Sequence, residues 1–339
     1  MDKIKINVLS KADSVPAQGV GSAFVEQVRL IKQSNLLDVE INSKKKDFDL
    51  IHIHSVNLPY FFKMKRYKGR NIVYVHFIPS RNDGSIKLPK LIGWMFNKYV
   101  NAFYKRASNL VVVNPCFIDP LLELGIAKEK ITYIPNYVDS SEFFKKSDEE
   151  VLDIRKKYEI SPDEFVVLGV GQIQTRKGID DFIETAKLNP DMKFIWAGGF
   201  SFGRITHGYK KYKKLMQNPP KNVKFPGILD RKSMNDIYNI SNCLFMPSYC
   251  ELFPMAILEA SRIGVPILLR DLDLYSPILF DYYLKGKDPK SFSEELQKLE
   301  EDKDVFASYS SKSSNISKYY NKDNILKIWE TYYKQKANL

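Results

Sequence analysis

The chain is poor in the residues that build disulfide frameworks and metal centres. It has three cysteines and four histidines among 339 residues. An odd number of cysteines without zinc-ligand spacing predicts a reducing compartment and no structural disulfide. Neither a carboxylate nor a cysteine completes a recognisable ligand set with His52, His54 and His76. We therefore expect no metal and no bound cofactor.

Long apolar runs are also missing. No segment approaches the roughly 20 consecutive apolar residues of a membrane-spanning helix. The first residues alternate like a strand instead of forming a cleavable leader, so we expect a protein that stays in the cytosol. A hydrophobic content of 44% and a charged content of 27% are those of a globular protein. A chain of 339 residues is long for one core, which predicts two domains.

Acidic residues are almost absent from one stretch. Residues 58–106 contain eleven lysines and arginines against Asp83 alone, a local net charge of +10. Such an imbalance indicates a polyanion or an anionic bilayer as partner. Residues 87–106 have a helical period and mix lysines with aromatic side chains, and residues 58–70 resemble a second, shorter amphipathic segment. The side chains that we expect at a membrane or acceptor surface are Lys63, Lys65, Arg66, Lys87, Lys90, Trp94 and Lys98.

Two other interpretations of this stretch exist. The apolar face of the 87–106 helix can pack on a sheet while its lysines are merely solvated, and we expect such packing on one side with bilayer contact on the other. Nucleic acid also attracts basic patches with aromatic residues. No helix-turn-helix, zinc-finger or ribonucleoprotein motif accompanies this patch, so we expect no nucleic-acid partner.

The first half of the chain reads as alternating strands and helices. A strand at 4–9 leads to Gly19 and Gly21, which permit close approach of the backbone to a ligand before a helix at 23–32. A plain strand-to-helix turn is an equal alternative. Two further apolar runs end in His54 and His76, at the strand ends where open α/β sheets bind ligands. A histidine in such a place can also be a satisfied core residue.

Two segments of the second half carry charged residues beside predicted helix starts. Arg176 and Lys177 precede a helix at 179–187, a position suited to a diphosphate. After the apolar run 243–246, Glu251 lies in a loop before a helix that starts at Pro254 and ends at Gly264. Backbone N–H groups at such a helix start favour an anionic ligand. The alternative is that all these charges are simply solvated.

The pair Glu251 and Glu259, with seven residues between them, resembles the donor-binding signature of the retaining GT-B glycosyltransferases of family 4. Pro254 stands where that family usually has glycine. Lys177 matches a lysine of the family, whereas Gln172 stands where its arginine is expected, so we infer Arg176 as the substitute. The Val-His pair ending at His76 and the Pro-Asn-Tyr-Val-Asp segment at 135–139 extend the resemblance over most of the chain.

The resemblance implies an α/β chain with the GT-B fold, in which two Rossmann-like domains face a central cleft. We expect an acceptor- and membrane-facing domain at 1–145, a nucleotide-sugar domain at 146–315, and a C-terminal helix at 316–339 that crosses back to the first domain. Transfer is implied to retain the anomeric configuration without a metal. The implied catalytic residues are His76, Glu251, Arg176 and Lys177, and the implied donor-binding residues are Gly19, Gly21, Arg176, Lys177, Ile228, Phe253, Pro254, Met255 and Glu259.

Residues 14–22, 75–79 and 174–178 look like segments of bacterial glycolipid synthases that add a second hexose to monoglucosyl-diacylglycerol. We therefore expect transfer of glucose or galactose from a UDP-hexose to that lipid, at the cytoplasmic face of the cell membrane. Two alternatives stay open. One is a soluble GT-B transferase of wall or capsular polysaccharide synthesis, and the other is a catalytically silent protein that binds a membrane surface. The sequence does not distinguish glucose from galactose as the donor sugar.

Overall fold

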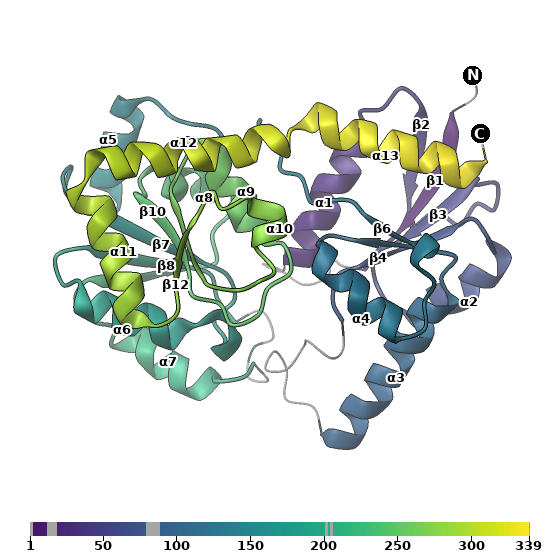
Figure 1. The fold of residues 1–339 in the computed structure, drawn as a ribbon, viewed down its shortest axis with the longest axis horizontal. Coiled ribbons are helices and arrows are strands. Elements are labelled where there is room, and N and C mark those ends of the chain that lie inside the picture. The colour runs from purple at the N-terminus through teal and green to yellow at the C-terminus, as the bar shows by residue number, and fades with distance from the viewer. Residues whose placement is uncertain (1–2, 12–18, 79–88, 201–202, 204–205, 339) are drawn as a thin grey trace. The chain divides into compact units, whose positions relative to one another are not determined.

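The computed structural model describes residues 3–11, 19–78, 89–200, 203 and 206–338, without the side chains of Val20 and Lys90. These residues form two compact units, each described by itself below. The first consists of the described residues up to 137 together with 320–338, and the second consists of those from 138 to 319. In Figure 1 the first unit runs from purple to blue and includes the yellow end of the chain.

The first unit is built on a parallel sheet. Within the described residues its strands are β1 (Ile4–Leu9), β2 (Leu37–Ile41), β3 (Leu50–Ile53), β4 (Asn71–Val75), β5 (Asn109–Val112) and β6 (Ile131–Tyr133), in the order β2-β1-β3-β4-β5-β6. The strands β1, β3, β4 and β5 are apolar almost throughout and buried, as expected when helices cover both faces of a parallel sheet. The strands predicted before His54 and His76 are thereby confirmed.

The helices of the first unit are α1 (Gly19–Ile31), α2 (Leu58–Arg66), α3 (Lys90–Arg106), α4 (Ile118–Glu123) and α13 (Lys322–Ala337), with short 3₁₀ turns at Pro115–Phe117 and Lys128–Lys130. One prediction is wrong: α1 begins at Gly19 and not at Ala23, so both predicted loop glycines lie in its first turn. Glycine weakens a helix, but packing of an amphipathic helix outweighs that preference. The C-terminal helix α13 packs against α1, β1 and β3 of the same unit.

The second unit repeats the design. Its strands in the described chain are β7 (Val166–Val170), β8 (Lys193–Ala197), β9 (Val223–Gly227), β10 (Cys243–Met246), β11 (Ile267–Arg270) and β12 (Leu284–Gly286), all parallel in the order β12-β11-β10-β7-β8-β9. The helices are α5 (Asp148–Lys157), α6 (Ile179–Leu188), α7 (Tyr209–Gln217), α8 (Arg231–Asn239), α9 (Met255–Ile263), α10 (Ser276–Leu279), α11 (Pro289–Glu301) and α12 (Lys303–Tyr319).

Aromatic side chains fill the core of the second unit behind β7. Phe182 of α6 contacts Trp196 edge-on, with 5.0 Å between ring centroids, and stacks on Phe245 at 5.7 Å. A side chain at Gly169 would overlap the Trp196 ring, so only glycine admits this packing. The Trp196 indole N–H donates to the carbonyl of Gly171 at 2.9 Å. The core thus fixes the turn that follows β7.

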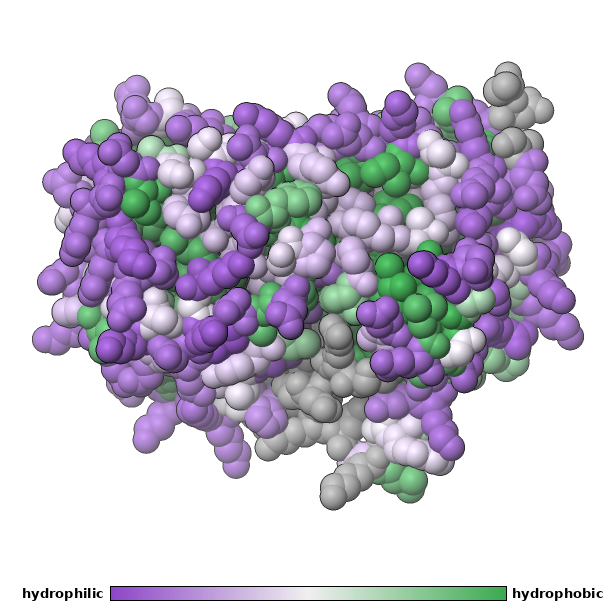
Figure 2. All heavy atoms as spheres, viewed as in Figure 1, coloured by the Kyte–Doolittle hydropathy of each residue, from purple (hydrophilic) through white to green (hydrophobic). Residues whose placement is uncertain are grey.

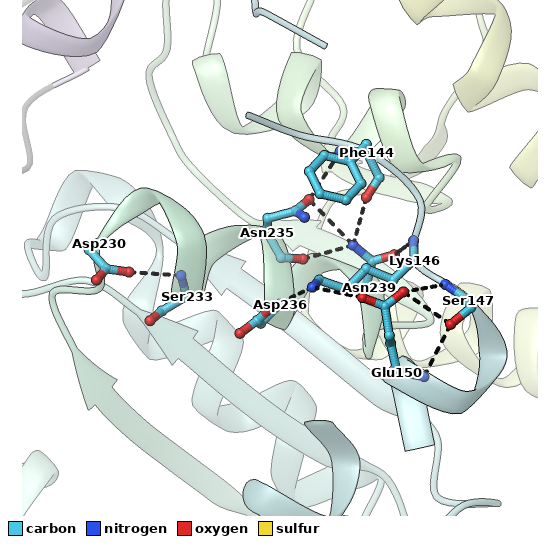
Figure 3. A network of polar contacts seen from close by, with 9 residues as sticks. All are labelled: Phe144, Lys146, Ser147, Glu150, Asp230, Ser233, Asn235, Asp236 and Asn239. Atoms are coloured by element: carbon cyan, nitrogen blue, oxygen red, sulfur yellow. Dashed lines mark hydrogen bonds and ion pairs between the residues drawn. The ribbon is translucent and has the colours of Figure 1, made fainter. Parts of the chain in front are cut away.

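The segment that enters the second unit is fastened by polar contacts. Ser147 caps α5 and exchanges hydrogen bonds with Glu150. The Asn239 amide of α8 receives a hydrogen bond from the Lys146 N–H at 2.8 Å and donates to the Phe144 carbonyl at 3.0 Å (Figure 3). Asp236 of the same helix pairs with the Lys146 ammonium at 3.2 Å. Residues 144–150 are therefore an integral part of this unit.

Candidate active site

The centre of the candidate site is a buried ion pair in the second unit. Lys177, at the end of the 3₁₀ turn Thr175–Lys177, is hydrogen-bonded to Glu251, in the loop between β10 and α9. Their exposed fractions are only 9% and 6%. The strands β7 and β10 are parallel neighbours, so the loops at their carboxyl ends meet at one edge of the sheet. The fold thus brings together two predicted site residues, Lys177 and Glu251, that are 74 positions apart in the sequence.

Glycine allows the two loops to approach. Gly178 has φ of +73°, and a Cβ atom there would overlap the carbonyl of Pro247, at the end of β10. Lys177 passes over Gly171, where a Cβ atom would lie 3.4 Å from Cε of the lysine. Gly198, after β8, has φ of +151° and lies so close to the Gly171 carbonyl that no side chain fits. The backbone turns after β7 and β8 are therefore packed directly on each other.

Arg176 adds a second positive charge beside the pair. Its Nη1 donates to the Cys250 carbonyl at 2.9 Å, and the Tyr249 N–H donates to the Arg176 carbonyl at 2.8 Å. Gln174 is buried beside the guanidinium. With its amide oxygen facing Arg176, it accepts hydrogen bonds from Nη2 at 3.3 Å and from Nε at 3.2 Å. The guanidinium is thus oriented by the loop that carries Glu251, and Gln174 is a contributor that the sequence analysis did not identify.

The pKa values of the pair follow from burial and charge. Burial alone would raise the pKa of Glu251, but Lys177 and then Arg176 outweigh it and hold this pKa below its usual range. Burial lowers the pKa of Lys177, and Glu251 acts in the opposite direction. Glu251 is therefore a carboxylate at neutral pH. An anionic ligand that reached this site would lie beside two positive side chains, Arg176 and Lys177.

The second carboxylate, Glu259, lies inside α9 and is held by a partner that has no sequence signature. Tyr238 of α8 donates its hydroxyl proton to Oε2 of Glu259 at 2.7 Å, and both side chains are buried. Phe253 and Met255 are also buried at the start of α9. The prediction that Pro254 is the first helical residue is wrong by one position, because it is the N-cap.

Ile228 is the most exposed of the predicted donor-binding residues in this unit. Its side chain is 50% exposed and packs over Gly199, in the turn that follows β8. The backbone N–H of Gly198 donates to the Gly227 carbonyl at 2.8 Å, which joins this turn to the end of β9. Ile228 thus belongs to the same sheet edge as Lys177.

A further network, missed in the sequence, supports the loop before Glu251. Arg270, at the end of β11, forms an ion pair with Asp181 of α6 and donates from Nε to the Pro247 carbonyl at 2.9 Å. Tyr249 donates to the same Asp181 carboxylate at 2.7 Å, and its ring centroid lies 4.0 Å from the Arg270 guanidinium. No sequence motif identifies these residues, because they are distant in the chain and meet only through the order of the strands.

The predicted histidine of the first unit is buried in an aromatic cluster. His76 follows β4, is 7% exposed, and stacks on Tyr74 with 4.6 Å between centroids. His54 follows β3, and its Nδ1 lies 3.2 Å from Nε2 of His76. Gly19 and Gly21 lie in the first turn of α1.

The basic surface of the first unit carries exposed apolar side chains. Leu91 and Trp94 of α3 are 68% and 54% exposed, and the Lys98 ammonium lies 4.0 Å from the Trp94 ring centroid. Further along α3, Val100 and Phe103 are buried. The helix therefore packs through its C-terminal half, while hydrophobic and hydrophilic atoms lie side by side at the surface over α3 (Figure 2).

The predicted basic residues do not all behave alike. Lys65 and Arg66 of α2 are exposed. Lys63 is half-buried and donates to the Ser43 carbonyl at 3.5 Å, and burial lowers its pKa. Lys87 lies outside the described residues, and so does the side chain of Lys90.

No group of three or more histidine, cysteine, aspartate or glutamate side chains among the described residues is arranged to hold a metal ion. None of the helices described is long and apolar enough to cross a bilayer. The expectation of metal-free chemistry stays a prediction.

Two family models match the chain. The one described as "Glycosyl transferases group 1" matches residues 150–323, and "Glycosyltransferase Family 4" matches residues 22–142. The alpha-galactosylglucosyldiacylglycerol synthase of Streptococcus pneumoniae is 42% identical over 99% of this chain and 91% of its own length. The processive diacylglycerol alpha-glucosyltransferase of Acholeplasma laidlawii is 31% identical over 85% of this chain and 86% of its own.

Solved structures with low sequence identity share the fold. The sucrose-phosphate synthase of Thermosynechococcus elongatus has a TM-score of 0.80 at 16% identity, covering 98% of this chain and 99% of that one. Anabaena HepE in complex with UDP-glucose has a TM-score of 0.75 at 15% identity, covering 96% and 97%. Together with the two six-stranded parallel sheets, these findings confirm the predicted fold class. The chain therefore belongs to the family 4, group 1 glycosyltransferases and is a glycosyltransferase with the GT-B fold.

Proposed function

We propose that this glycosyltransferase moves a hexose, glucose or galactose, from a UDP-hexose to monoglucosyl-diacylglycerol and forms a dihexosyl-diacylglycerol. Two observations together support the proposal. The chain has a buried Lys177–Glu251 pair beside Arg176, and it is 42% identical, over nearly its whole length, to a synthase named for a galactosylglucosyl lipid. A second relative, 31% identical, is also named for glucosyl transfer to a diacylglycerol.

In this proposal the diphosphate of the donor binds to Arg176 and Lys177. The guanidinium offers paired donors and the ammonium a compact charge, which together neutralise a diphosphate leaving group without a metal. Glu251 then loses part of its contact with Lys177 and becomes an acceptor for hydroxyl groups of the hexose. Glu259, held by Tyr238, binds the ribose hydroxyls. Gly19, Gly21, Ile228, Phe253, Pro254 and Met255 complete the proposed donor site.

The proposed reaction retains the anomeric configuration. The bond between the anomeric carbon and the β-phosphate oxygen breaks, and the acceptor hydroxyl oxygen bonds to the same face of that carbon. The hydroxyl proton goes to the leaving phosphate, so no protein base is needed. His76 and Glu251 hold the hexose while positive charge develops on its ring.

The proposed acceptor lies in a membrane, and the first unit offers a surface suited to one. Trp94 and Leu91 are exposed on α3, and Lys98, Lys65 and Arg66 are exposed beside apolar side chains of α3 and α2. Aromatic rings and long basic side chains favour the headgroup layer of an anionic bilayer. We therefore propose peripheral binding at the cytoplasmic face.

The assay uses radiolabelled UDP-glucose or UDP-galactose with monoglucosyl-diacylglycerol in anionic micelles, followed by chromatography of the lipids. We expect label in a dihexosyl lipid with one of the two donors, and an α-linkage by NMR of the product. Lys177→Ala should raise the donor KM or abolish turnover. Lys187→Ala is the matched control, because Lys187 is an exposed lysine on α6 whose ion-pair partner in the described part of the chain is its neighbour Glu184. Absence of labelled lipid with both donors would contradict the proposal.

The two alternatives give different results in the same set of experiments. A soluble transferase of polysaccharide synthesis should not sediment with anionic vesicles. A catalytically silent surface-binding protein should neither hydrolyse nor transfer either donor, and Glu251→Gln should then change nothing. We expect vesicle binding that Lys98→Glu weakens about 30-fold. Each basic residue near an anionic surface contributes about 1 kcal/mol, and the reversal replaces that attraction by a similar repulsion, about 2 kcal/mol in all.

A further inference from the structure

The two histidines that follow β3 and β4 form one cluster in the first unit. β3 and β4 are parallel neighbours, with Ile53 opposite Val73. Side chains two positions apart in a strand share a face, so the rings of residues 52, 54, 74 and 76 gather on one side of the sheet. Tyr74 stacks on His54 with 4.8 Å between centroids and on His76 with 4.6 Å. Stacking on Tyr74 therefore restricts the orientation of the His76 ring.

One hydrogen bond joins the two imidazoles. Nδ1 of His54 lies 3.2 Å from Nε2 of His76. Burial lowers the pKa of His76 to about 3 and that of His54 well below its usual range. Each ring is therefore neutral at physiological pH and carries one proton, and only one of the two protons lies between the rings.

The surroundings of His54 decide which ring donates. Nε2 of His54 is buried and has no hydrogen-bond partner among the described residues. A proton on Nε2 would leave a buried N–H unpaired, which costs about 1–3 kcal/mol, and such orphaned donors are rarer than orphaned acceptors. The proton of His54 is thus on Nδ1, which donates to Nε2 of His76. His76 then carries its own proton on Nδ1.

We propose that His54 is a positioning residue, whose Nδ1–H holds His76 in the Nδ1–H tautomer so that His76 presents an N–H donor to a hydroxyl oxygen of the donor hexose. The nitrogen that a hydrogen bond occupies decides what the other ring nitrogen offers. His76 therefore acts by holding the sugar and not by accepting a proton. The role of His76 rests on the proposed function, but its tautomer does not.

The other neighbours of the cluster provide a control. His52 lies two residues before His54, and its Nδ1 lies 2.8 Å from the Tyr333 hydroxyl and 3.2 Å from Nε2 of Gln27. Its ring is tilted by 43° to the ring of His54, with 4.5 Å between centroids, and no hydrogen bond joins it to His76. A substitution at His52 disturbs the same core without touching the bond in question.

The tautomer is tested first, by NMR of the protein labelled with ¹⁵N-histidine. With four histidines in the chain, single His→Gln variants assign every ring. We expect His76 protonated at Nδ1 and bare at Nε2 in the wild type and in His52→Asn. His54→Asn should preserve this state, because an asparagine amide N–H can take the place of Nδ1–H. His54→Leu removes the donor and should allow His76 to be protonated at Nε2.

The kinetic consequence is tested on the same variants in the glycolipid assay. His54→Leu should lower kcat by about 10- to 100-fold, the loss typical when the partner that orients a functional histidine is removed. His54→Asn should stay within about threefold of the wild type, as should His52→Asn, and thermal unfolding checks that all three fold. A merely structural role would make the His52 and His54 variants equally damaging.

Two results would overturn the proposal. The first is a wild type in which His76 is protonated at Nε2. The second is a His54→Leu variant that folds and keeps both the Nδ1–H tautomer and the wild-type kcat. If the wild type transfers no hexose, the proposed function and the role of His76 fail together, and the NMR result then shows separately whether His54 sets the tautomer.

Discussion

Replacing Lys177 by methionine should destabilise the second unit by about 3 kcal/mol at neutral pH. Removing one partner of a buried ion pair typically costs about 3–5 kcal/mol, because the other charge is left in a poorly solvated place. Lys177 and Glu251 are both more than nine-tenths buried. Arg176 also lowers the pKa of Glu251, so part of the compensation remains and the cost should fall at the lower end of that range.

The pH dependence of the loss has a definite sign. In the wild type the lowered pKa of Glu251 stabilises the fold above the unfolded value of 4.5, and this contribution disappears as the pH falls through the folded pKa. Without Lys177, burial becomes the dominant influence and the pKa of Glu251 should rise. The variant then loses stability as the pH increases from the unfolded pKa of Glu251 through its raised pKa in the folded variant. The difference between the two proteins should therefore be large at pH 7 and should vanish once the pH falls below the lowered pKa of Glu251 in the folded wild type.

Urea unfolding measures the effect. The chain has three tryptophans, and only Trp196 belongs to the second unit. In a background with Trp94→Phe and Trp329→Phe, tryptophan fluorescence follows the core directly behind the site. The double variant Lys177→Met, Glu251→Leu should recover most of the stability and none of the transferase activity. A single variant that loses less than about 1 kcal/mol, or a double variant as unstable as the single one, would refute the reasoning.

Three more outcomes are expected. Tyr238→Phe removes the hydrogen bond to Glu259 and should raise the donor KM about fivefold, equal to about 1 kcal/mol, with little change in kcat; an unchanged KM would separate Glu259 from the donor. Gly178→Ala should lower the stability of the second unit by about 1–3 kcal/mol in urea unfolding, because φ is +73° and the methyl group overlaps the Pro247 carbonyl; wild-type stability would contradict that geometry. Trp94→Ala should weaken sedimentation with anionic vesicles without changing hydrolysis of the donor, and an equal loss in both would indicate misfolding instead.

Much of the fold was predictable because local patterns and packing agree. The apolar run before Pro247 predicted β10 at Cys243–Met246 residue by residue. The start of α6 at Ile179 was also predicted correctly. The start of α1 was not, because its first turn contains two glycines that favour a loop when read locally. Packing of that helix within the first unit, which no local pattern reports, outweighs their poor propensity.

The candidate site was predictable only in part. Arg176, Lys177 and Glu251 were identified beside predicted helix starts and then matched to a family by resemblance, and their roles at a substrate stay predictions. Tyr238, Gln174 and the Asp181–Arg270 pair were missed, because a tyrosine in an amphipathic helix or an aspartate in a first helical turn is typical of countless surfaces. Their importance comes from what they contact.

The sequence alone determined the class of this protein: its alternating apolar runs and helices, its scarcity of cysteine, its basic stretch and the spacing of two glutamates. Only the tertiary structure decided the partners. β10 lies beside β7, and β3 lies beside β4. Those adjacencies place Lys177 against Glu251 and His54 against His76. Hydrogen bonds and ion pairs act over a few ångströms in space, whereas sequence patterns report only neighbours along the chain, so the order of the strands had to be seen.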